Sequence, residues 1–285
     1  MDARLWDGTT DHVAMLKSLT MPLAPRESLG AATNRKLRLF AVACHRSLPG
    51  FLSWADGIDP KQIVLDAERH AEGPSPEENA TDDLNSRATA TSTWCGVWFA
   101  GDSAWGTVNS LVRSTGLFKG PLSPVRAASL LREIFGNPFR PCEAFRAECK
   151  LCVGLGRITD GFWLDVECPT CGGVGLVRRT PAWLGPCVMD LARAVGEERL
   201  PDGAFVTDRL FVLADALEEA GCTESELLSH LRCTVLCANC GHGVSHLLDE
   251  ERRLYGGCLW CQSLETMPHR HFPGCWVLDL LLGKE

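Results

Sequence analysis

The sequence of 285 residues lacks the long apolar segments that membrane insertion and export require. No window of about 18 apolar residues occurs in it, so we expect no transmembrane helix. The first residues, MDARLWDGTTDH, contain neither a basic start nor an apolar run, so we expect no secretory signal peptide. Together these absences predict a cytoplasmic protein without a membrane partner.

Basic charge is also in short supply. The chain has 28 Lys and Arg residues against 36 Asp and Glu residues, which gives a formal net charge of −8. Proteins that bind nucleic acid usually carry a basic patch, because neutralising phosphates and releasing counterions supplies much of their affinity. The charge balance therefore disfavours a nucleic-acid partner, and a nucleic-acid-associated regulator remains the alternative hypothesis.

Common catalytic motifs are missing as well. The sequence contains no P-loop, GxSxG or HExxH motif, and no GxGxxG before a predicted helix. His269, His271 and Cys275 form a small group of potential metal ligands or a Cys–His pair, but no base or cleft can be identified beside them. An enzyme assembled from scattered residues is a third hypothesis, and the missing motifs favour a protein that is not an enzyme.

Cysteine, by contrast, is abundant, and eight of the 15 cysteines fall in four CxxC pairs. Fifteen residues separate the first two pairs, and 17 residues separate the last two. In a reducing compartment such spacings are typical of metal sites and not of disulfides. Zinc binds four thiolates as a tetrahedron. The sequence thus predicts two structural Zn²⁺ sites, with the ligands Cys149, Cys152, Cys168, Cys171, Cys237, Cys240, Cys258 and Cys261.

The all-cysteine composition argues against catalytic zinc, which keeps one position open and usually takes histidine or carboxylate ligands. A redox role for a single CxxC pair is disfavoured, because each pair has a partner pair at metal-binding spacing. At the second site, Cys233, His242 or His246 could replace one thiolate, although four cysteines already complete the set.

Glycines follow the first two pairs in register, as Cys152-Val-Gly154-Leu-Gly156 and Cys171-Gly-Gly173-Val-Gly175. Glycine lets the chain turn sharply where a side chain would crowd the metal loop. This CxxCxGxG unit resembles the cysteine-rich region of DnaJ-type co-chaperones over residues 149–175. That region has four units and two metal sites, whereas this chain has two units and lacks the HPD tripeptide of a J-domain. The resemblance implies a zinc ribbon with a peptide-binding surface, without co-chaperone activity.

Helical patterns dominate the rest of the sequence. Apolar spacing predicts helices over 34–48, 60–72, 125–135, 182–199, 208–220 and 225–232. Ser123 starts the third of these with Pro124, and Thr223 with Glu226 forms a capping box for the last. Pro186 lies inside the 182–199 pattern and predicts a separate or kinked first turn. The apolar segment 274–285 fits a helix or a strand.

The predicted fold is mainly α, with a helical body and two inserted small β zinc ribbons. Residues 1–141, 180–232 and 268–285 are assigned to the helical body. Residues 142–179 form the first ribbon and residues 233–267 the second. Capped helical patterns resume after the first ribbon and an apolar element follows the second, which favours insertion into one body.

Several segments of the helical body resemble an expanded family of uncharacterised bacterial helical proteins. The most specific are LLREIFGNPFRP and GCWVLDLLLGKE, together with NRKLRLFAVACHR, PAWL and FVLADALEEAGC. Members of that family run directly from the NPFRP segment to PAWL, and from the LADALE helix to the terminus. The resemblance therefore implies that both ribbons are insertions. It implies a fold and no activity.

The ribbons show no basic excess. Residues 142–179 carry five basic and five acidic side chains, and residues 233–267 carry two basic and four acidic. Ribbons that bind nucleic acid display more Lys and Arg, so these favour protein contacts. Phe162, Trp163 and Trp260 are candidate anchors for a protein partner, although packing on the helical body explains them equally well. The sequence predicts a zinc-binding protein-interaction or adaptor module.

The first turn of the predicted 34–48 helix holds three cations, Arg35, Lys36 and Arg38. The helix dipole disfavours cations at this end of a helix. They could form a docking surface for an acidic partner, or they could lie on a face exposed to solvent.

Overall fold

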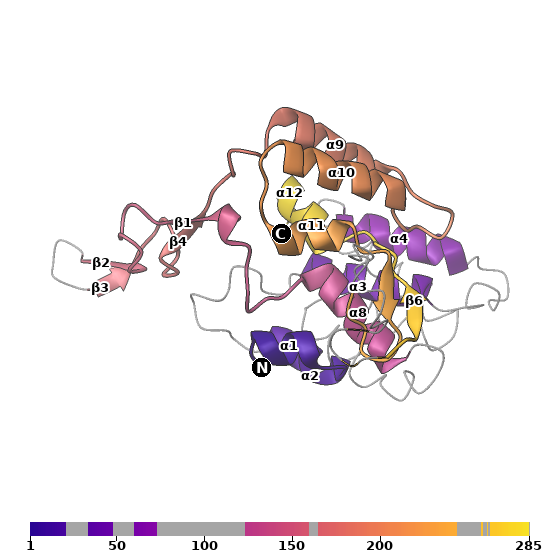
Figure 1. The fold of residues 1–285 in the computed structure, drawn as a ribbon. Coiled ribbons are helices and arrows are strands. Elements are labelled where there is room, and N and C mark those ends of the chain that lie inside the picture. Colours follow the sequence, from indigo (N-terminus) through magenta and orange to yellow (C-terminus); the bar gives the residue numbers. More distant parts are fainter. Residues whose placement is uncertain are drawn as a thin grey trace.

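The structure, a computed structural model, describes residues 1–20, 34–47, 60–72, 123–159, 165–243, 258, 261 and 263–284. Within these ranges the chain forms nine α-helices, one 3-10 helix and three short antiparallel strand pairs (Figure 1). A mainly helical fold with small β elements is therefore confirmed. None of the described helices is long and apolar enough to cross a membrane.

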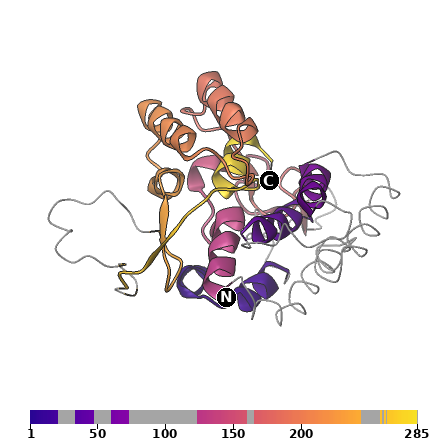
Figure 2. The same cartoon turned by 90° about the vertical axis from the view of Figure 1, so that its right-hand side faces the viewer.

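The helices that precede the first cysteine pair share one hydrophobic core. They are α1 (Ala3–Gly8), α2 (His12–Thr20), α3 (Asn34–Arg46), α4 (Pro60–Glu72) and α8 (Pro124–Phe135). Trp6, Phe40 and Leu131 are among its fully buried side chains. In Figure 2, α8 (magenta) lies between α1 and α2 (indigo) below and α9 and α10 (salmon and orange) above.

Local caps fix α1 and α2, which the apolar pattern did not predict. The Asp2 carboxylate accepts a hydrogen bond from the Leu5 N–H at 2.8 Å, and the Asp11 carboxylate accepts one from the Ala14 N–H at 3.0 Å. The two helices are only six and nine residues long. Few apolar positions can repeat over such lengths, so periodicity carries little signal there.

The helix α8 begins and ends as predicted. The Ser123 hydroxyl accepts a hydrogen bond from the Arg126 N–H at 3.2 Å, and Pro124 occupies the first turn. Gly136 ends the helix with a φ of 62°, a conformation that favours glycine. The buried face of α8 includes one carboxylate, that of Glu133.

The helices that follow the first cysteine module share a second core. They are α9 (Pro186–Glu197), α10 (Thr207–Glu219), α11 (Ser225–Leu231) and α12 (Trp276–Leu282). The terminal apolar segment is thus a helix. The first turn of the predicted 182–199 helix is separate, as one alternative had it: the Leu184 N–H donates to the Pro181 carbonyl at 3.0 Å, and α9 begins at Pro186, which lacks an N–H and suits a first turn. The Thr223 capping box is wrong, since Glu224 occupies the N-cap of α11 without a side-chain capping bond.

An ion pair links the two cores. Arg35 in the first turn of α3 donates two hydrogen bonds to the buried Asp279 carboxylate of α12, at 2.7 and 3.0 Å. Arg35 also contacts Glu72 of α4. Lys36 is buried too. The docking-surface and solvent-face interpretations are therefore both wrong for Lys36, which is buried, and for Arg35, which is partly buried and paired with carboxylates of this chain.

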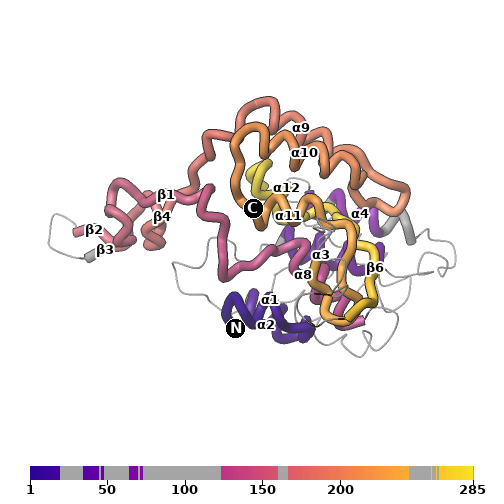
Figure 3. The backbone as a smooth tube through the Cα atoms, in the orientation of Figure 1, coloured from indigo at the N-terminus to yellow at the C-terminus, as the bar shows by residue number. Residues whose placement is uncertain are grey.

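The first cysteine module, residues 142–179, begins with the 3-10 helix η3 (Glu143–Phe145). Its strands are β1 (Arg146–Glu148), β2 (Arg157–Thr159), β3 (Asp165–Glu167) and β4 (Leu176–Arg178), and β1 pairs with β4 while β2 pairs with β3. The Arg179 N–H donates to the Phe145 carbonyl at 2.9 Å, so the module leaves and rejoins the helices at one point. Figures 1 and 3 show it extending away from the helices.

The second cysteine module, residues 233–267, lies against α8 instead. Its strands are β5 (Val235–Cys237) and β6 (Thr266–Pro268), which pair in an antiparallel register. The Ser129 hydroxyl of α8 donates to the Gly241 carbonyl at 3.3 Å. A Cβ at Gly241 would lie 2.3 Å from that hydroxyl oxygen, so glycine allows the close approach.

Candidate metal centres

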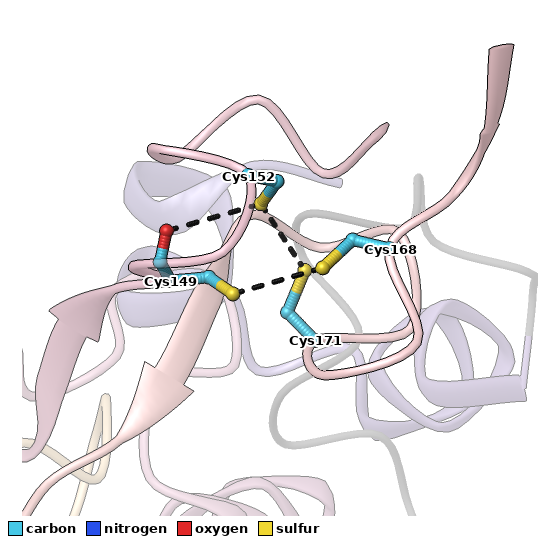
Figure 4. A group of neighbouring side chains, drawn as sticks. All are labelled: Cys149, Cys152, Cys168 and Cys171. Carbon is cyan, nitrogen blue, oxygen red and sulfur yellow. Dashed lines mark hydrogen bonds between the residues drawn. The ribbon is translucent and has the colours of Figure 1, made fainter. Parts of the chain in front are cut away.

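The first four predicted ligands meet inside the first cysteine module. Figure 4 shows the thiols of Cys149 and Cys152 facing those of Cys168 and Cys171. The Sγ atoms of Cys149 and Cys168 are 3.7 Å apart, and those of Cys152 and Cys171 are 3.6 Å apart. Thiolates around a tetrahedral zinc with bonds of about 2.3 Å are about 3.8 Å apart. The tetrad could therefore hold a metal ion.

The two halves of this tetrad repeat the same backbone pattern. The Cys149 N–H donates to the Gly175 carbonyl at 2.9 Å, and the Cys168 N–H donates to the Gly156 carbonyl at 2.8 Å. Gly156 and Gly175 have φ values of 76° and 81°. A Cβ at Gly156 would lie 2.0 Å from a backbone oxygen, and one at Gly175 would lie 2.1 Å from another. Both glycines are required so that the two loops can pack together.

The same glycines also contact the sulfur atoms. The Gly156 N–H donates to Cys152 Sγ, and the Gly175 N–H donates to Cys171 Sγ, each at 3.2 Å. A hydrogen bond to the charged form of a group stabilises that form. The second glycine of each CxxCxGxG unit therefore both admits the tight turn and stabilises a thiolate that could bind a metal.

The thiols of the first tetrad differ in acidity. Burial raises the pKa of Cys152 to about 11. Burial acts in the same direction on Cys168, but hydrogen bonds from the Cys171 and Thr170 N–H groups outweigh it and lower the pKa of Cys168 to about 7. Since a metal binds thiolates, its arrival would displace protons from the less acidic members of the tetrad.

The four predicted ligands of the second site also meet. The Sγ atoms of Cys237 and Cys261 are 3.5 Å apart, and those of Cys240 and Cys258 are 3.4 Å apart. Cys237 and Cys258 are buried, and Cys240 and Cys261 are partly buried. A hydrogen bond from the Asn239 side chain lowers the pKa of Cys261 to about 6. This second tetrad could hold a metal ion as well.

The alternative ligands of the second site lie beside the tetrad. The Nδ1 atom of His242 is 3.3 Å from Cys240 Sγ, close enough to orient that sulfur. The Cys233 thiol donates to the Val235 carbonyl at 3.5 Å. His246 lies outside the described residues. Among the described residues, the four cysteines are the group at this site whose donor atoms all lie within 4.8 Å of one another, and replacement of a thiolate by His242 or Cys233 stays an alternative.

The sequence missed the apolar side chains that the first metal loop exposes. Leu151, Val153 and Leu155 are 54%, 72% and 70% exposed. The alternation of apolar and other residues in so short a loop did not predict that these side chains would be exposed. The predicted anchors Phe162, Trp163 and Trp260 all lie outside the described residues and stay a prediction.

The group predicted from His269, His271 and Cys275 gains two members in the folded chain. Glu133 of α8 and His230 of α11 join it, and both are separated from it by long stretches of sequence. No spacing rule connects residues on different helices, so the sequence could not have shown this cluster.

Comparisons of the chain with protein-family models, with curated proteins and with solved structures find no match. The resemblances to DnaJ-type cysteine-rich regions and to bacterial helical proteins therefore stay predictions. What the fold itself establishes is a mainly helical chain with two four-cysteine clusters, each close enough to hold a metal ion.

Proposed function

We propose that this protein is a zinc-stabilised protein-interaction module. Both tetrads offer four thiolates at separations that suit tetrahedral Zn²⁺. Four cysteines fill the whole coordination sphere, as in structural zinc ribbons, and leave no position for a substrate or an activated water. Zinc in this role fixes the shape of each module and does not take part in a reaction.

The observation that carries the proposal is the exposed apolar loop of the first cysteine module. Leu151 lies between the two cysteines of the first pair, Val153 and Leu155 follow that pair directly, and the module that carries them extends away from the helices (Figure 1). Isolated exposed apolar residues are ordinary on protein surfaces, whereas a contiguous group often marks an interaction site. Three such side chains fall within five consecutive residues of one loop.

The backbone at Val153 supports the same interpretation. Its φ is 50°, and it is the one non-glycine residue with positive φ among those that the structure describes. This conformation is an outlier for a β-branched side chain. The equivalent position in the second half of the module is Gly172, with a φ of 56°. An exposed valine held where glycine would be unstrained suggests a role for its side chain outside the module.

The partner that suits this loop is an apolar protein segment. The first cysteine module has five basic and five acidic side chains, and a Zn²⁺ ion with four thiolates adds two negative charges, so the module has no excess of positive charge. The loop itself offers apolar side chains. An extended peptide with two or three apolar side chains could contact all three residues at once. An acidic partner and a nucleic acid fit this surface less well, because neither would bury its apolar area.

The proposal can be tested on an immobilised array of peptides that vary in apolar content. The full zinc-loaded protein should bind the apolar peptides, and the Leu151→Ser/Leu155→Ser variant should lose at least tenfold in affinity. Leu264→Ser is the matched control, since Leu264 is 75% exposed but lies in the second cysteine module. Equal binding by both variants would contradict the proposal. Salt-sensitive retention on nucleic acid in place of peptide binding would favour the regulator.

A further inference from the structure

A third group of potential ligands lies apart from the two tetrads, where the two hydrophobic cores meet. Its four donor atoms lie within 4.8 Å of one another. They come from α8, α11, the segment after β6 and the residue that precedes α12: Glu133, His230, His271 and Cys275. All of these side chains are buried or nearly so.

The separations within this cluster are those of ligands that share one ion. The His230 Nε2 atom is 3.0 Å from a Glu133 oxygen and 3.3 Å from Cys275 Sγ. The His271 Nδ1 atom is 3.1 Å from the other Glu133 oxygen and 3.9 Å from Cys275 Sγ. Tetrahedral zinc with bonds of about 2.0–2.3 Å places neighbouring ligand atoms about 3.3–3.8 Å apart. Small side-chain adjustments would suffice to coordinate an ion.

Without a metal ion, the histidine rings in and beside the cluster cannot donate a hydrogen bond to every oxygen that faces them. The two nitrogens of His271 face Glu133 and the Cys233 carbonyl, each at 3.1 Å. The two nitrogens of His269 face the same carboxylate and the same carbonyl, at 3.1 and 3.2 Å. A neutral imidazole has a single N–H, so each neutral ring would direct a lone pair at an oxygen. Protonating both rings would bury two like charges with ring centroids 4.3 Å apart.

We propose that Glu133, His230, His271 and Cys275 form a third metal site, which binds a divalent transition metal and is best suited to Zn²⁺. One carboxylate, one thiolate and two imidazoles form a mixed ligand set of the kind that zinc accepts. With the two anionic ligands, a dication gives a complex of zero net charge, which suits a buried position. The His271 Nδ1 atom coordinates the ion while Nε2–H donates to the Cys233 carbonyl, a usual arrangement for a metal-binding histidine.

His269 then lies outside the ligand set and contacts the Glu133 carboxylate. A hydrogen bond of this kind orients a metal-bound carboxylate. A cleft of about 560 Å³ borders Glu133, His230 and His269 and gives the ion a route to the site. The cluster thus has ligands, a supporting residue and an entry path.

The location of the site indicates what it does. Its ligands join α8 of the first core to α11 and α12 of the second. Two of them, His230 and His271, also flank the second cysteine module in sequence, and the carbonyl of Cys233 at the base of that module accepts a hydrogen bond from His271. A bound ion would therefore hold the two cores and the base of this module together.

The first test uses the unmodified full chain, purified under reducing conditions without added metal. Elemental mass spectrometry should find three divalent metal ions per chain, one more than the two tetrads hold. Zinc-edge X-ray absorption should give an average of about three sulfur neighbours per zinc, because the third site supplies a single thiolate. Two ions per chain with four sulfur neighbours each would overturn the proposal.

Variants locate the third ion. Cys275→Ala and His271→Gln should each lose one metal ion, and the remaining zinc should have four sulfur neighbours. Cys222→Ala is the matched control, because Cys222 is a buried cysteine of the same core that lies outside the cluster, and this variant should keep all three ions. Three ions retained in both cluster variants would also overturn the proposal. If a cluster variant fails to fold, the absorption spectrum of the unmodified chain decides the question.

Discussion

Arg35 and Asp279 are 244 positions apart in the sequence, yet they form a two-point ion pair that joins α3 to α12. The Asp279 side chain is 4% exposed and that of Arg35 is 20% exposed, so solvent screens the pair weakly. Both planar groups present two atoms to each other, a geometry that favours strong hydrogen bonds. Arg35, which the sequence alone would place on a surface, therefore connects two helices of the fold.

Replacing Arg35 with Ala should therefore destabilise the whole helical fold. Removing one partner of a buried pair leaves the other charge without compensation, and we expect a loss of about 3 kcal/mol in the free energy of unfolding. Urea denaturation followed by circular dichroism measures it. The control is Arg209→Ala, whose partner Glu198 is 2.9 Å away but where both side chains are about half exposed. That change should cost less than about 1 kcal/mol, and equal losses would contradict the argument.

Gly156→Ala should abolish metal binding by the first cysteine module. The new Cβ would lie 2.0 Å from a backbone oxygen of the opposite loop, so the two halves could not close around an ion. Gly172→Ala is the matched control, because its φ is also positive but no atom lies within 4 Å of the added Cβ. The control should keep its metal at a strain cost of about 1 kcal/mol. Metal analysis of both variants distinguishes close packing from backbone strain.

Replacing residues 146–178 with two glycines should leave the helices folded. The Arg179 N–H and the Phe145 carbonyl are 2.9 Å apart, so a very short linker spans the excision. The excision removes the hydrogen bond from Arg178 to the Leu280 carbonyl at 2.5 Å. Far-ultraviolet circular dichroism and thermal unfolding should show an intact helical core. A collapse of the helical signal would show that the module is part of the core and not an insertion.

Val153→Gly should separate the fold of the metal loop from its proposed binding role. Glycine adopts a positive φ without strain but adds freedom to the unfolded chain, so the module's stability should change by less than about 1 kcal/mol. Metal content should stay the same, while affinity for apolar peptides should fall severalfold. A variant that loses metal, or one that binds peptides as well as the unmodified chain, would contradict the role assigned to this side chain.

The tetrads could be predicted from sequence because their members are local. Two CxxC pairs within about 20 residues bring four thiols together almost regardless of what surrounds them. The register of the glycines was informative for the same reason, since the N–H groups of Gly156 and Gly175 donate to the sulfur atoms of Cys152 and Cys171 in their own loops. The α8 boundaries followed from Ser123, Pro124 and Gly136, whose effects are also confined to one turn.

The rest depends on contacts between distant elements. Nothing near Glu133 in sequence shows that its carboxylate will meet imidazoles from α11 and from the segment after β6. Nothing near Arg35 shows that it will form an ion pair with a buried carboxylate of α12. Exposure of Leu151 and Leu155 is equally non-local, because it depends on how far the first cysteine module extends from the helices. Periodicity reports which face of an element is apolar and not which partner will cover it.

The Arg35–Asp279 contact also bears on the order in which the chain acquires structure during synthesis. The first cysteine module closes on itself through contacts between near neighbours, so it can take up an ion soon after it leaves the ribosome. The contacts between the helices cannot all form so early, because Arg35 of α3 pairs with a carboxylate of α12, which is synthesised last. Long-range contacts of this kind form late. The nascent chain would therefore carry a finished metal-binding module on a core that is still open.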